Sequence, residues 1–270
     1  MTPSISEFLD KVYRTDALEL LKRLPDNSVD CIYADPDYNV GVKYNEKSYS
    51  KSFKDYLAWC VLWSQESKRV LKENGNFFII NYPKNNAHLR VNFLDGEFAS
   101  VNEYVWVYNT NIGHSAHKFT TAHRSILHCT ISKKNKFFKD HVAVEYKNPT
   151  DRRIMELLRQ GKKGRMPYDW FYFDLVKNVS RSKTFHSCQI PENLSRTLIL
   201  SCTEPNDVVL ILFGGSGSEI AECKILKRHF IAAELDKRYY NLILKRLESG
   251  GEVPEKYRLF KKTNLKSSSV

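Results

Sequence analysis

An acidic residue, a proline and an aromatic ring follow one of the most apolar runs of the chain. Residues 33–40 read YADPDYNV, which places Asp35, Pro36 and Tyr38 directly after that run. Aspartate and proline are common turn residues, so an ordinary turn is one interpretation. The other is a pocket in which the Asp35 carboxylate accepts protons from a planar group that stacks on the ring of Tyr38. These residues alone leave both interpretations open.

A glycine-rich turn, FGGSGS, is the second group of residues that could do chemistry. It places Gly214, Gly215 and Gly217 between an apolar run and a helical pattern. Glycine lets the backbone approach a ligand closely and adopt a positive φ. The start of the following helix adds exposed N–H donors. The turn therefore indicates a ligand that lies against the backbone at this point.

An acidic residue ends the next apolar run, because FIAAELD contains Glu234 and, two positions later, Asp236. Glu234 comes 17 positions after Gly217, which suits hydrogen bonds to the two hydroxyls of a ribose. A full G-x-G-x-x-G pattern would need glycine where Ile220 stands, so the pattern favours an adenosine-bearing cofactor over a dinucleotide. A structural turn beside a surface acid is the alternative interpretation.

Strands and helices alternate at both ends of the chain, and these elements must position the two motifs. Near the start, helical spacing covers residues 15–24 and 53–73, and the apolar runs at 29–34 and 76–81 indicate buried strands. Near the end, the same alternation predicts helices at 192–202, 218–227 and 236–249 and strands at 207–213 and 229–235. Near-continuous apolar strands between helices are typical of a mostly parallel sheet that is covered on both faces. We therefore predict an α/β fold with a doubly wound, mostly parallel sheet.

The middle of the chain, residues 82–185, breaks this alternation. Two strand-like pieces, 103–109 and 125–132, flank a polar loop, and a charged helical piece follows at 151–165. This change of pattern favours a lobe that is inserted into one domain over a separate second domain.

The domain organisation follows from these patterns. Residues 1–81 and 186–260 are expected to form one domain, with residues 82–185 as the inserted lobe. Residues 261–270, KKTNLKSSSV, are expected to be a flexible tail.

Positive charge is the most informative feature of the composition. Forty-two Lys and Arg residues stand against 31 Asp and Glu in 270 residues, which gives a formal net charge of +11. Such an excess indicates either a solvated basic surface or a polyanionic partner, most often nucleic acid. The chain contains no apolar stretch of the roughly 20 residues needed to span a bilayer, and its start does not read as an export signal, so we expect a cytoplasmic protein.

Cysteine and histidine usage gives no support for a metal site. The six cysteines are scattered without a C-x-x-C pair, which is typical of free thiols in a reducing compartment. Four histidines gather in and beside the polar loop, but no cysteine or carboxylate lies at ligand spacing from His114, His117, His123 and His128. We therefore predict that the protein holds no metal.

Four elements of the chain, in this order, resemble the β class of DNA amino methyltransferases. They are the D-P-x-Y motif, the segment WSQESKRVLKENGNFFI, the H-x-x-Q-x-P-like element HSCQIP at 186–191, and F-x-G-x-G with its downstream acid. Members of that class move a methyl group from S-adenosylmethionine to an exocyclic amine of a base that is rotated out of the duplex. The resemblance covers nearly the whole chain and implies a Rossmann-like methyltransferase fold in which residues 82–185 recognise the target.

The resemblance implies catalytic roles at the D-P-x-Y motif. Asp35 and the backbone carbonyl of Pro36 would accept hydrogen bonds from the target amine, and Tyr38 would stack on the base. S-Adenosylmethionine is the implied cofactor, with Glu234 at its ribose and the glycine turn at its methionine part. The complete set of implied cofactor-binding residues is Asp16, Ala17, Asp35, Phe213, Gly214, Gly215, Ser216, Gly217, Glu234 and Asp236.

Double-stranded DNA is the implied partner, and basic residues of the middle lobe are its expected contacts. Some would hold phosphates and one or two would touch base edges. The candidates are Lys118, His123, Arg124, Lys133, Lys134, Arg152, Arg153, Lys162, Lys163 and Arg165. The resemblance also leaves open a homodimer and a cognate restriction endonuclease of a restriction–modification system as further partners; no membrane partner is expected.

Two positions depart from the family pattern. Asp37 stands where the family has a second proline, and Ile211-Leu212 stands where it has Asp-Pro. The first change adds negative charge to the turn, and the second removes a polar group near the cofactor. The departures make a catalytically impaired DNA-binding protein an alternative to an active enzyme.

Adenine N6 is the expected target, because Asp at position 35 is more typical of adenine than of cytosine-N4 members. Three functions therefore stay open: an adenine-N6 methyltransferase, a cytosine-N4 methyltransferase, and a DNA-binding member of the fold that has lost catalysis. A nicotinamide oxidoreductase is disfavoured, because it explains neither the D-P-x-Y motif nor the basic lobe.

Overall fold

The computed structural model describes residues 3–39, 43–44, 47–48, 51–109, 116–176, 183–186 and 188–258. His114 and the tail at 261–270, for which the sequence predicts flexibility, lie outside the described residues.

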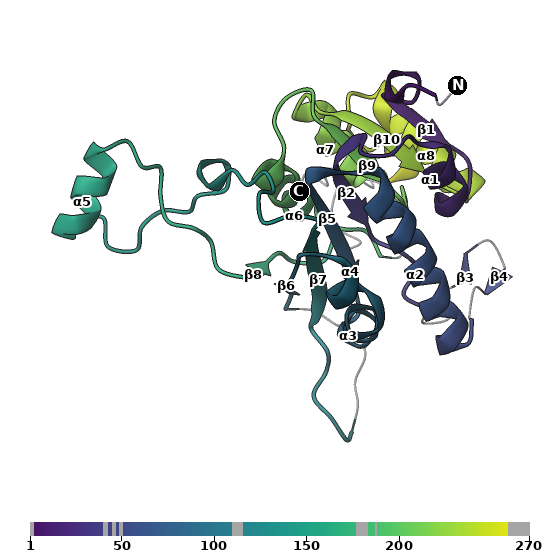
Figure 1. The fold of residues 1–270 in the computed structure, drawn as a ribbon, viewed down its shortest axis with the longest axis horizontal. Helices are drawn as coiled ribbons and strands as arrows, with labels where there is room; N and C mark the ends of the chain where they lie inside the picture. Colours follow the sequence, from purple (N-terminus) through teal and green to yellow (C-terminus); the bar gives the residue numbers. More distant parts are fainter. Residues whose placement is uncertain are drawn as a thin grey trace, which may run out of the picture.

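A single eight-stranded sheet forms the centre of the molecule (Figure 1). Five of its strands run parallel in the order β1 (Lys11–Tyr13), β10 (His229–Ala233), β9 (Val208–Ile211), β2 (Val29–Ala34) and β5 (Leu71–Asn81). The sheet continues through β7 (His123–Thr130), which is antiparallel to β5 and to β6 (Ser100–Val107), and it ends at β8 (Trp170–Tyr172). The mostly parallel α/β fold that the sequence predicts is therefore confirmed.

Helices cover both faces of the sheet, and the alternation of side chains along β2 shows why. Ile32 points into a core that includes Leu20 of α1 (Ala17–Arg23) and Trp63 of α2 (Phe53–Val70). Tyr33, one residue later, points into the opposite core, where α6 (Glu192–Cys202), α7 (Ser218–Ile225) and α8 (Lys237–Glu248) pack. Every residue of β2 is buried, as expected for a parallel strand between two helical layers.

The remaining elements are short. The first core also receives α3 (Pro83–Leu89), which continues through a π-helical turn (Arg90–Leu94) into α4 (Asp95–Glu97). Two short strands, β3 (Lys43–Tyr44) and β4 (Lys47–Ser48), pair with each other outside the main sheet. The described residues also include 3₁₀ turns at Ile5–Glu7, Lys139–His141 and Glu255–Tyr257.

The observed boundaries differ from the predicted ones where pairing overrides the local pattern. The predicted helix 53–73 ends at Val70, because Leu71 already pairs with Val29 as the first residue of β5. The sequence pattern gave no sign of the three-residue strands β1 and β8 or of the short helix α3. Strands this short carry too few alternating residues to produce a period-2 signal.

Two strands of the expected lobe belong to the main sheet. β7 pairs with β5 over five positions, and seven of its eight residues are buried. Residues 131–169 leave the sheet and carry α5 (Arg152–Arg159) at the end of an extended arm (Figure 1). No residue of α5 is buried. How the chain divides into a domain and a lobe therefore stays a prediction.

A buried carboxylate joins three parts of the fold near the amino ends of the central strands. Asp30, whose side chain is 2 % exposed, accepts hydrogen bonds from Lys72 Nζ at 2.7 Å and Lys136 Nζ at 3.0 Å. It also accepts from the backbone N–H of Val208 at 3.0 Å. Burial raises the pKa of Asp30, but the hydrogen bonds from Lys72, Val208 and Lys136 outweigh burial, so the pKa lies below its usual value. The ionised carboxylate therefore ties β2, β5 and β9 together.

We expect Asp30→Asn to lower the free energy of unfolding by about 1–3 kcal/mol. The uncharged amide would form weaker hydrogen bonds with Lys72, Lys136 and the N–H of Val208 at this buried position. Since the folded-state pKa is depressed, this contribution is present above the unfolded pKa and is lost as pH falls through the folded pKa. Urea unfolding at pH 7 and pH 3 measures both effects, and the gap between variant and wild type should shrink in acid. Glu97→Gln, which breaks the surface pair with Lys68, is the control and should change the unfolding free energy by less than about 0.5 kcal/mol. Equal effects of the two substitutions would contradict this assignment.

Candidate active site

The two sequence motifs meet at the carboxyl edge of the sheet, although they are far apart in the chain. β2, β9 and β10 are neighbours, and their registers bring Tyr33 beside Ile211 and Ile211 beside Ala232. Asp35 follows β2, the glycine turn follows β9 and Glu234 follows β10. The carboxyl edge of a parallel sheet is where ligands bind in open α/β folds.

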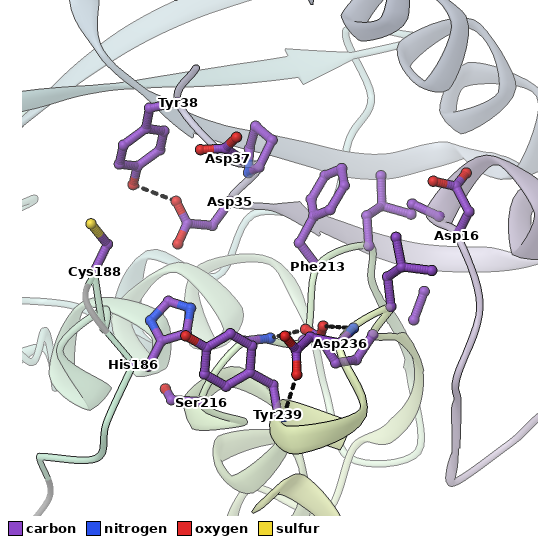
Figure 2. Close-up of a pocket in the computed structure, with 18 of the residues that line it drawn as sticks. Asp16, Asp35, Asp37, Tyr38, His186, Cys188, Phe213, Ser216, Asp236 and Tyr239 are labelled. Carbon is purple, nitrogen blue, oxygen red and sulfur yellow. Dashed lines mark hydrogen bonds between the residues drawn. The ribbon is translucent and has the colours of Figure 1, made fainter. Parts of the chain in front are cut away.

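A cavity of about 510 Å³ opens at this edge (Figure 2). It brings together the acidic turn of the D-P-x-Y motif, the glycine turn and the start of α1. Every predicted catalytic and cofactor-binding residue except Gly217 lines it: Asp16, Ala17, Asp35, Pro36, Tyr38, Phe213, Gly214, Gly215, Ser216, Glu234 and Asp236. Gly217 is the N-cap residue of α7, directly behind the turn.

Asp35 and Tyr38 are hydrogen-bonded to each other (Figure 2). The Tyr38 hydroxyl donates to Asp35 Oδ1 at 2.5 Å, and Tyr38 is 6 % exposed. Burial raises the pKa of Asp35 to about 8, even though the Tyr38 hydroxyl and the charge of Arg124 lower it; Glu219 raises it further. Burial therefore opposes the ionised form of Asp35, and the hydrogen bond from Tyr38 favours that form.

Asp37 is the departure from the family proline, and its carboxyl group is half-buried at the cavity. Within the described part of the chain its Oδ1 atom is buried and makes no hydrogen bond. Burial raises the pKa of Asp37, while the backbone N–H groups of Asn39 and Tyr38 lower it. The turn is held in place from α2, because the Tyr56 hydroxyl donates to the Asp37 carbonyl at 2.7 Å.

The glycine turn needs glycine for both conformation and space. Gly215 and Gly217 have φ values of +50° and +74°, in the left-handed region. A Cβ atom on Gly214 would lie 2.8 Å from Ile243 Cδ1, and one on Gly215 would lie 3.1 Å from His186 Nε2. The turn is therefore packed between α8 and the HSCQIP segment, with its backbone at the cavity wall.

Glu234 is connected to the glycine turn. Its carboxylate accepts from the N–H of Gly215 and from the N–H of Asp236, each at 2.7 Å. Burial raises its pKa to about 7, although the backbone N–H groups of Asp236 and Gly215 lower it. These bonds fix the orientation of the carboxylate at the cavity while its remaining lone pairs stay available to hydroxyl groups.

Asp16 and Asp236 begin helices at the cavity. Asp16 caps α1 through the N–H of Leu18 at 2.8 Å, and Asp236 caps α8 through the N–H of Arg238 at 2.7 Å. The capping bonds explain locally why acidic residues stand at these two helix starts.

Several cavity residues were not predicted from the sequence. Glu219, in the first turn of α7, lines the cavity and accepts from the Ser195 hydroxyl at 3.2 Å; burial raises its pKa to about 7. His186 also lines the cavity, and burial lowers its pKa to about 4, with Lys183 as a further cause. Position directly after a glycine turn is a signal that could have identified Glu219. His186 carries no such local signal beyond its place in HSCQIP.

The predicted DNA contacts do not gather at the cavity. Most are exposed and lie on three separate segments: before β7, directly after β7, and on the arm with α5. The exposed ones are Lys118, Lys133, Lys134, Arg152, Arg153, Lys162 and Lys163, while His123 and Arg165 are half-buried. Arg124 differs from all of them, because it is 9 % exposed and lies against Tyr38.

Three exposed aromatic side chains lie on the same part of the chain as some of these basic residues, and the sequence analysis did not predict them. Tyr168, Trp170 and Tyr172 are 50–52 % exposed, and the rings of Tyr168 and Trp170 stack with an interplanar angle of 15°. The Arg165 guanidinium lies 4.4 Å from the centre of the Tyr168 ring. Alternation of aromatic residues in YDWFY was the available signal, since alternate residues of a strand share a face.

Among the described residues, no cluster of three or more His, Cys, Asp and Glu side chains could hold a metal ion. The same part of the chain contains no helix that is both long and apolar enough to cross a membrane.

Comparisons with known proteins place the chain in a family. A family model for DNA methylases, the N6/N4 methyltransferases, matches residues 29–245. The type II methyltransferase M.HinfI of Haemophilus influenzae is 30% identical over 92% of this chain and 70% of its own length. The DNA adenine methyltransferase YhdJ of Escherichia coli is 28% identical over 86% of this chain and 81% of its own length.

Solved structures agree with this placement. The cytosine-N4-specific PvuII DNA methyltransferase superimposes with a TM-score of 0.67 at 16% identity, over 94% of this chain and 87% of its own. M1.HpyAVI in its complex with SAM superimposes with a TM-score of 0.57 at 25% identity, over 87% of this chain and 98% of its own. The first of these shows a common fold. From the matched family model and the relatives together, the chain belongs to the DNA methylase family of N6/N4 methyltransferases.

Proposed function

We propose that this protein is a site-specific DNA methyltransferase that moves a methyl group from S-adenosylmethionine to the N6 amine of adenine. The observation that carries the proposal is the single cavity in which Asp35 and Tyr38 face the glycine turn and Glu234. One motif supplies groups for a planar amine, and the other supplies groups for an adenosine. A cavity that contains both sets of groups suits a reaction between a planar amine and an adenosine-bearing ligand.

The cavity residues fit S-adenosylmethionine. The glycine turn exposes backbone that a side chain would cover, and Glu234 is a fixed carboxylate suited to ribose hydroxyls. The half-buried acidic groups suit a ligand with a positive charge. When bound, S-adenosylmethionine would supply an activated methyl group, whose bond to the sulfonium sulfur breaks as the methyl group is transferred and leaves S-adenosylhomocysteine.

Asp35 would orient the target amine and receive its proton. An ionised Asp35 accepts a hydrogen bond from the amine, which increases electron density on the nitrogen that attacks the methyl carbon. The amine sheds one proton as its new N–C bond forms, and a carboxyl group whose pKa is raised to about 8 by burial is suited to accept it near neutral pH. The Pro36 carbonyl would accept the second amine hydrogen.

Tyr38 would hold the base in the plane of attack. Its hydroxyl now donates to Asp35 Oδ1, so the amine either takes the other carboxylate oxygen or displaces the hydroxyl. Stacking on a rotated-out base requires the ring to be held in a fixed orientation, because small misplacements of the reacting atoms cost large factors in rate.

Adenine is the favoured base for two reasons. Asp at position 35 is typical of adenine-N6 members of the β class, and one relative carries adenine in its name, the DNA adenine methyltransferase YhdJ. The name of M.HinfI as a type II methyltransferase supports a role in restriction–modification, with an endonuclease for the same site as the genetic partner. We propose residues 82–185 as the lobe that recognises the site, with its basic residues on DNA phosphates.

The wild-type protein should transfer labelled methyl from S-adenosylmethionine to unmethylated genomic DNA, and nucleoside analysis should identify N6-methyladenine. Asp35→Asn should lower the rate at least about 100-fold, because it removes the charged acceptor of the amine. Asp140→Asn, at an exposed position, is the control.

Two other outcomes separate the alternatives. If N4-methylcytosine were the product, the proposal of adenine as the target base would be wrong, while the proposal of methyl transfer to DNA would stand. Binding of DNA and cofactor without transfer would favour an impaired protein, with Asp37 and Ile211-Leu212 as the responsible departures.

Glu234→Gln should weaken S-adenosylmethionine binding by about tenfold or more, because hydrogen bonds to a charged acceptor contribute about 1.5–3 kcal/mol. Isothermal titration calorimetry measures the dissociation constant. Glu248→Gln, on the exposed end of α8, should leave it unchanged. An unchanged constant for Glu234→Gln would place the ribose elsewhere.

We expect the binding of S-adenosylmethionine to depend on pH. Burial raises the pKa of Asp35 to about 8 and those of Glu219 and Glu234 to about 7. A cationic ligand favours the ionised forms, so the dissociation constant of S-adenosylmethionine should fall between pH 6 and pH 9, and binding should release protons. Calorimetry in two buffers with different ionisation enthalpies counts those protons. The product S-adenosylhomocysteine, which lacks the sulfonium charge, should show a weaker dependence, and equal dependence for both ligands would contradict the charge argument.

A further inference from the structure

Arg124 has an unusual position for an arginine that the sequence groups with DNA contacts. It is 9 % exposed, and its guanidinium carbon lies 3.9 Å from the centre of the Tyr82 ring. The same carbon lies 5.3 Å from the ring centres of Tyr38 and Tyr108. The guanidinium is therefore enclosed by three aromatic rings, one of which belongs to the D-P-x-Y motif.

The sheet brings these rings together from separate elements. β7 is antiparallel to β5, so its first residues lie at the carboxyl edge, with Ser125 paired to Asn81 at the end of β5. Tyr82 follows Asn81 directly. Tyr108 follows the last residue of β6, which pairs with His123 at the start of β7. Arg124 is thus placed by strand register at the same edge as Asp35.

Hydrogen bonds fix the guanidinium inside this enclosure. It donates to the Tyr82 hydroxyl at 3.1 Å, to the His123 carbonyl at 3.2 Å, and to the Tyr108 hydroxyl. The ring faces attract the guanidinium charge, and this attraction is stronger where water is excluded. Tyr38 in turn meets Tyr82 edge-on, with ring centres 5.2 Å apart. The orientation of Tyr38 therefore depends on a packed arrangement with Arg124 at its centre.

Arg124 also acts on the charge of Asp35. The groups that influence Asp35 are the Tyr38 hydroxyl, Glu219 on α7 and Arg124 on β7, and Tyr33 on β2 lies within electrostatic range. Burial is the largest cause and raises the pKa of Asp35; the Tyr38 hydroxyl lowers it, Glu219 raises it and Arg124 lowers it. Arg124 is the cation among these groups. Without the charge of Arg124, only the Tyr38 hydroxyl would lower the pKa of Asp35, while burial and Glu219 would still raise it.

We propose that Arg124 is a positioning residue for methyl transfer, because it fixes the Tyr38 ring and supplies the positive charge beside Asp35. The inference rests on the proposed function, since it assigns Arg124 to the same reaction. A residue that holds phosphates would instead present its donors to solvent, and those of Arg124 are directed at neighbouring protein groups.

The test compares Arg124→Gln, which removes the charge, with Arg124→Lys, which keeps it. Arg124→Gln should lower kcat at least about tenfold, with the KM for DNA changed less than about twofold. In the pH profile of kcat, the fall in rate on the acidic side should move to higher pH, because the charge of Arg124 lowers the pKa of Asp35. Arg124→Lys should keep the wild-type profile. Arg90→Gln, which breaks a surface pair with Asp95, is the control and should match the wild type.

A second measurement does not depend on turnover. Carboxyl carbon NMR of protein labelled at aspartate, with the Asp35 signal assigned through Asp35→Asn, reports the titration of Asp35 directly. The midpoint should be higher in Arg124→Gln than in the wild type and in Arg124→Lys. If the wild type transferred no methyl, the proposed function would fail, while this titration would still decide the role of Arg124.

Three results would overturn the inference. They are an Asp35 titration that is the same in all folded variants, a loss of kcat that is equal at every pH, and a raised KM for DNA with unchanged kcat, which would make Arg124 a DNA contact. Tyr82→Leu guards against a variant that fails to fold, because it removes the nearest ring and keeps the charge. Tyr82→Leu should lower kcat without shifting the acidic side of the pH profile of kcat. A shift of that profile would contradict the assignment.

Discussion

The burial of Asp35 at the end of the central strand is the constraint on which the rest of the site depends. β2 is covered on both faces, and Asp35, the first residue after it, is half-buried at the wall of the cavity. A carboxyl group there resists ionisation, and its pKa is raised to about 8 mainly by burial. The neighbouring groups then decide its charge: the Tyr38 hydroxyl and Arg124 favour the ionised form, and Glu219 opposes it.

The same strand geometry supplies the cofactor half of the cavity. β9 ends beside β2 and β10 ends beside β9, so the glycine turn and Glu234 reach the same edge without any long loop. Hydrogen bonds from Gly215 and Asp236 to Glu234 then join the two turns into one wall. The reacting groups of the proposed mechanism thus come from strand ends that the hydrogen-bonded sheet fixes relative to one another, which suits a reaction that needs accurate alignment.

Much of the fold and of the candidate site follows from local patterns. β2 and α6 occupy the predicted residues, because an all-apolar run and a helix with proline before it are strong local signals. The cavity contains every predicted cofactor residue except Gly217. The predictions were less accurate where elements are short or where strand pairing decides, because α2 ends three residues early and the short strands β1 and β8 were not predicted.

The sequence by itself determined which residues line the candidate site, because Asp35, Tyr38, the glycine turn and Glu234 follow apolar runs and stand in motifs that resemble those of a known family. The tertiary structure alone decided the surroundings of those residues. Arg124 reads as one more cation of a basic lobe, and only the antiparallel register of β7 places it among three tyrosine rings. Glu219 likewise becomes a cavity residue only when α7 packs behind the turn. Contacts between residues distant in the chain depend on strand order and packing, which local sequence patterns do not encode.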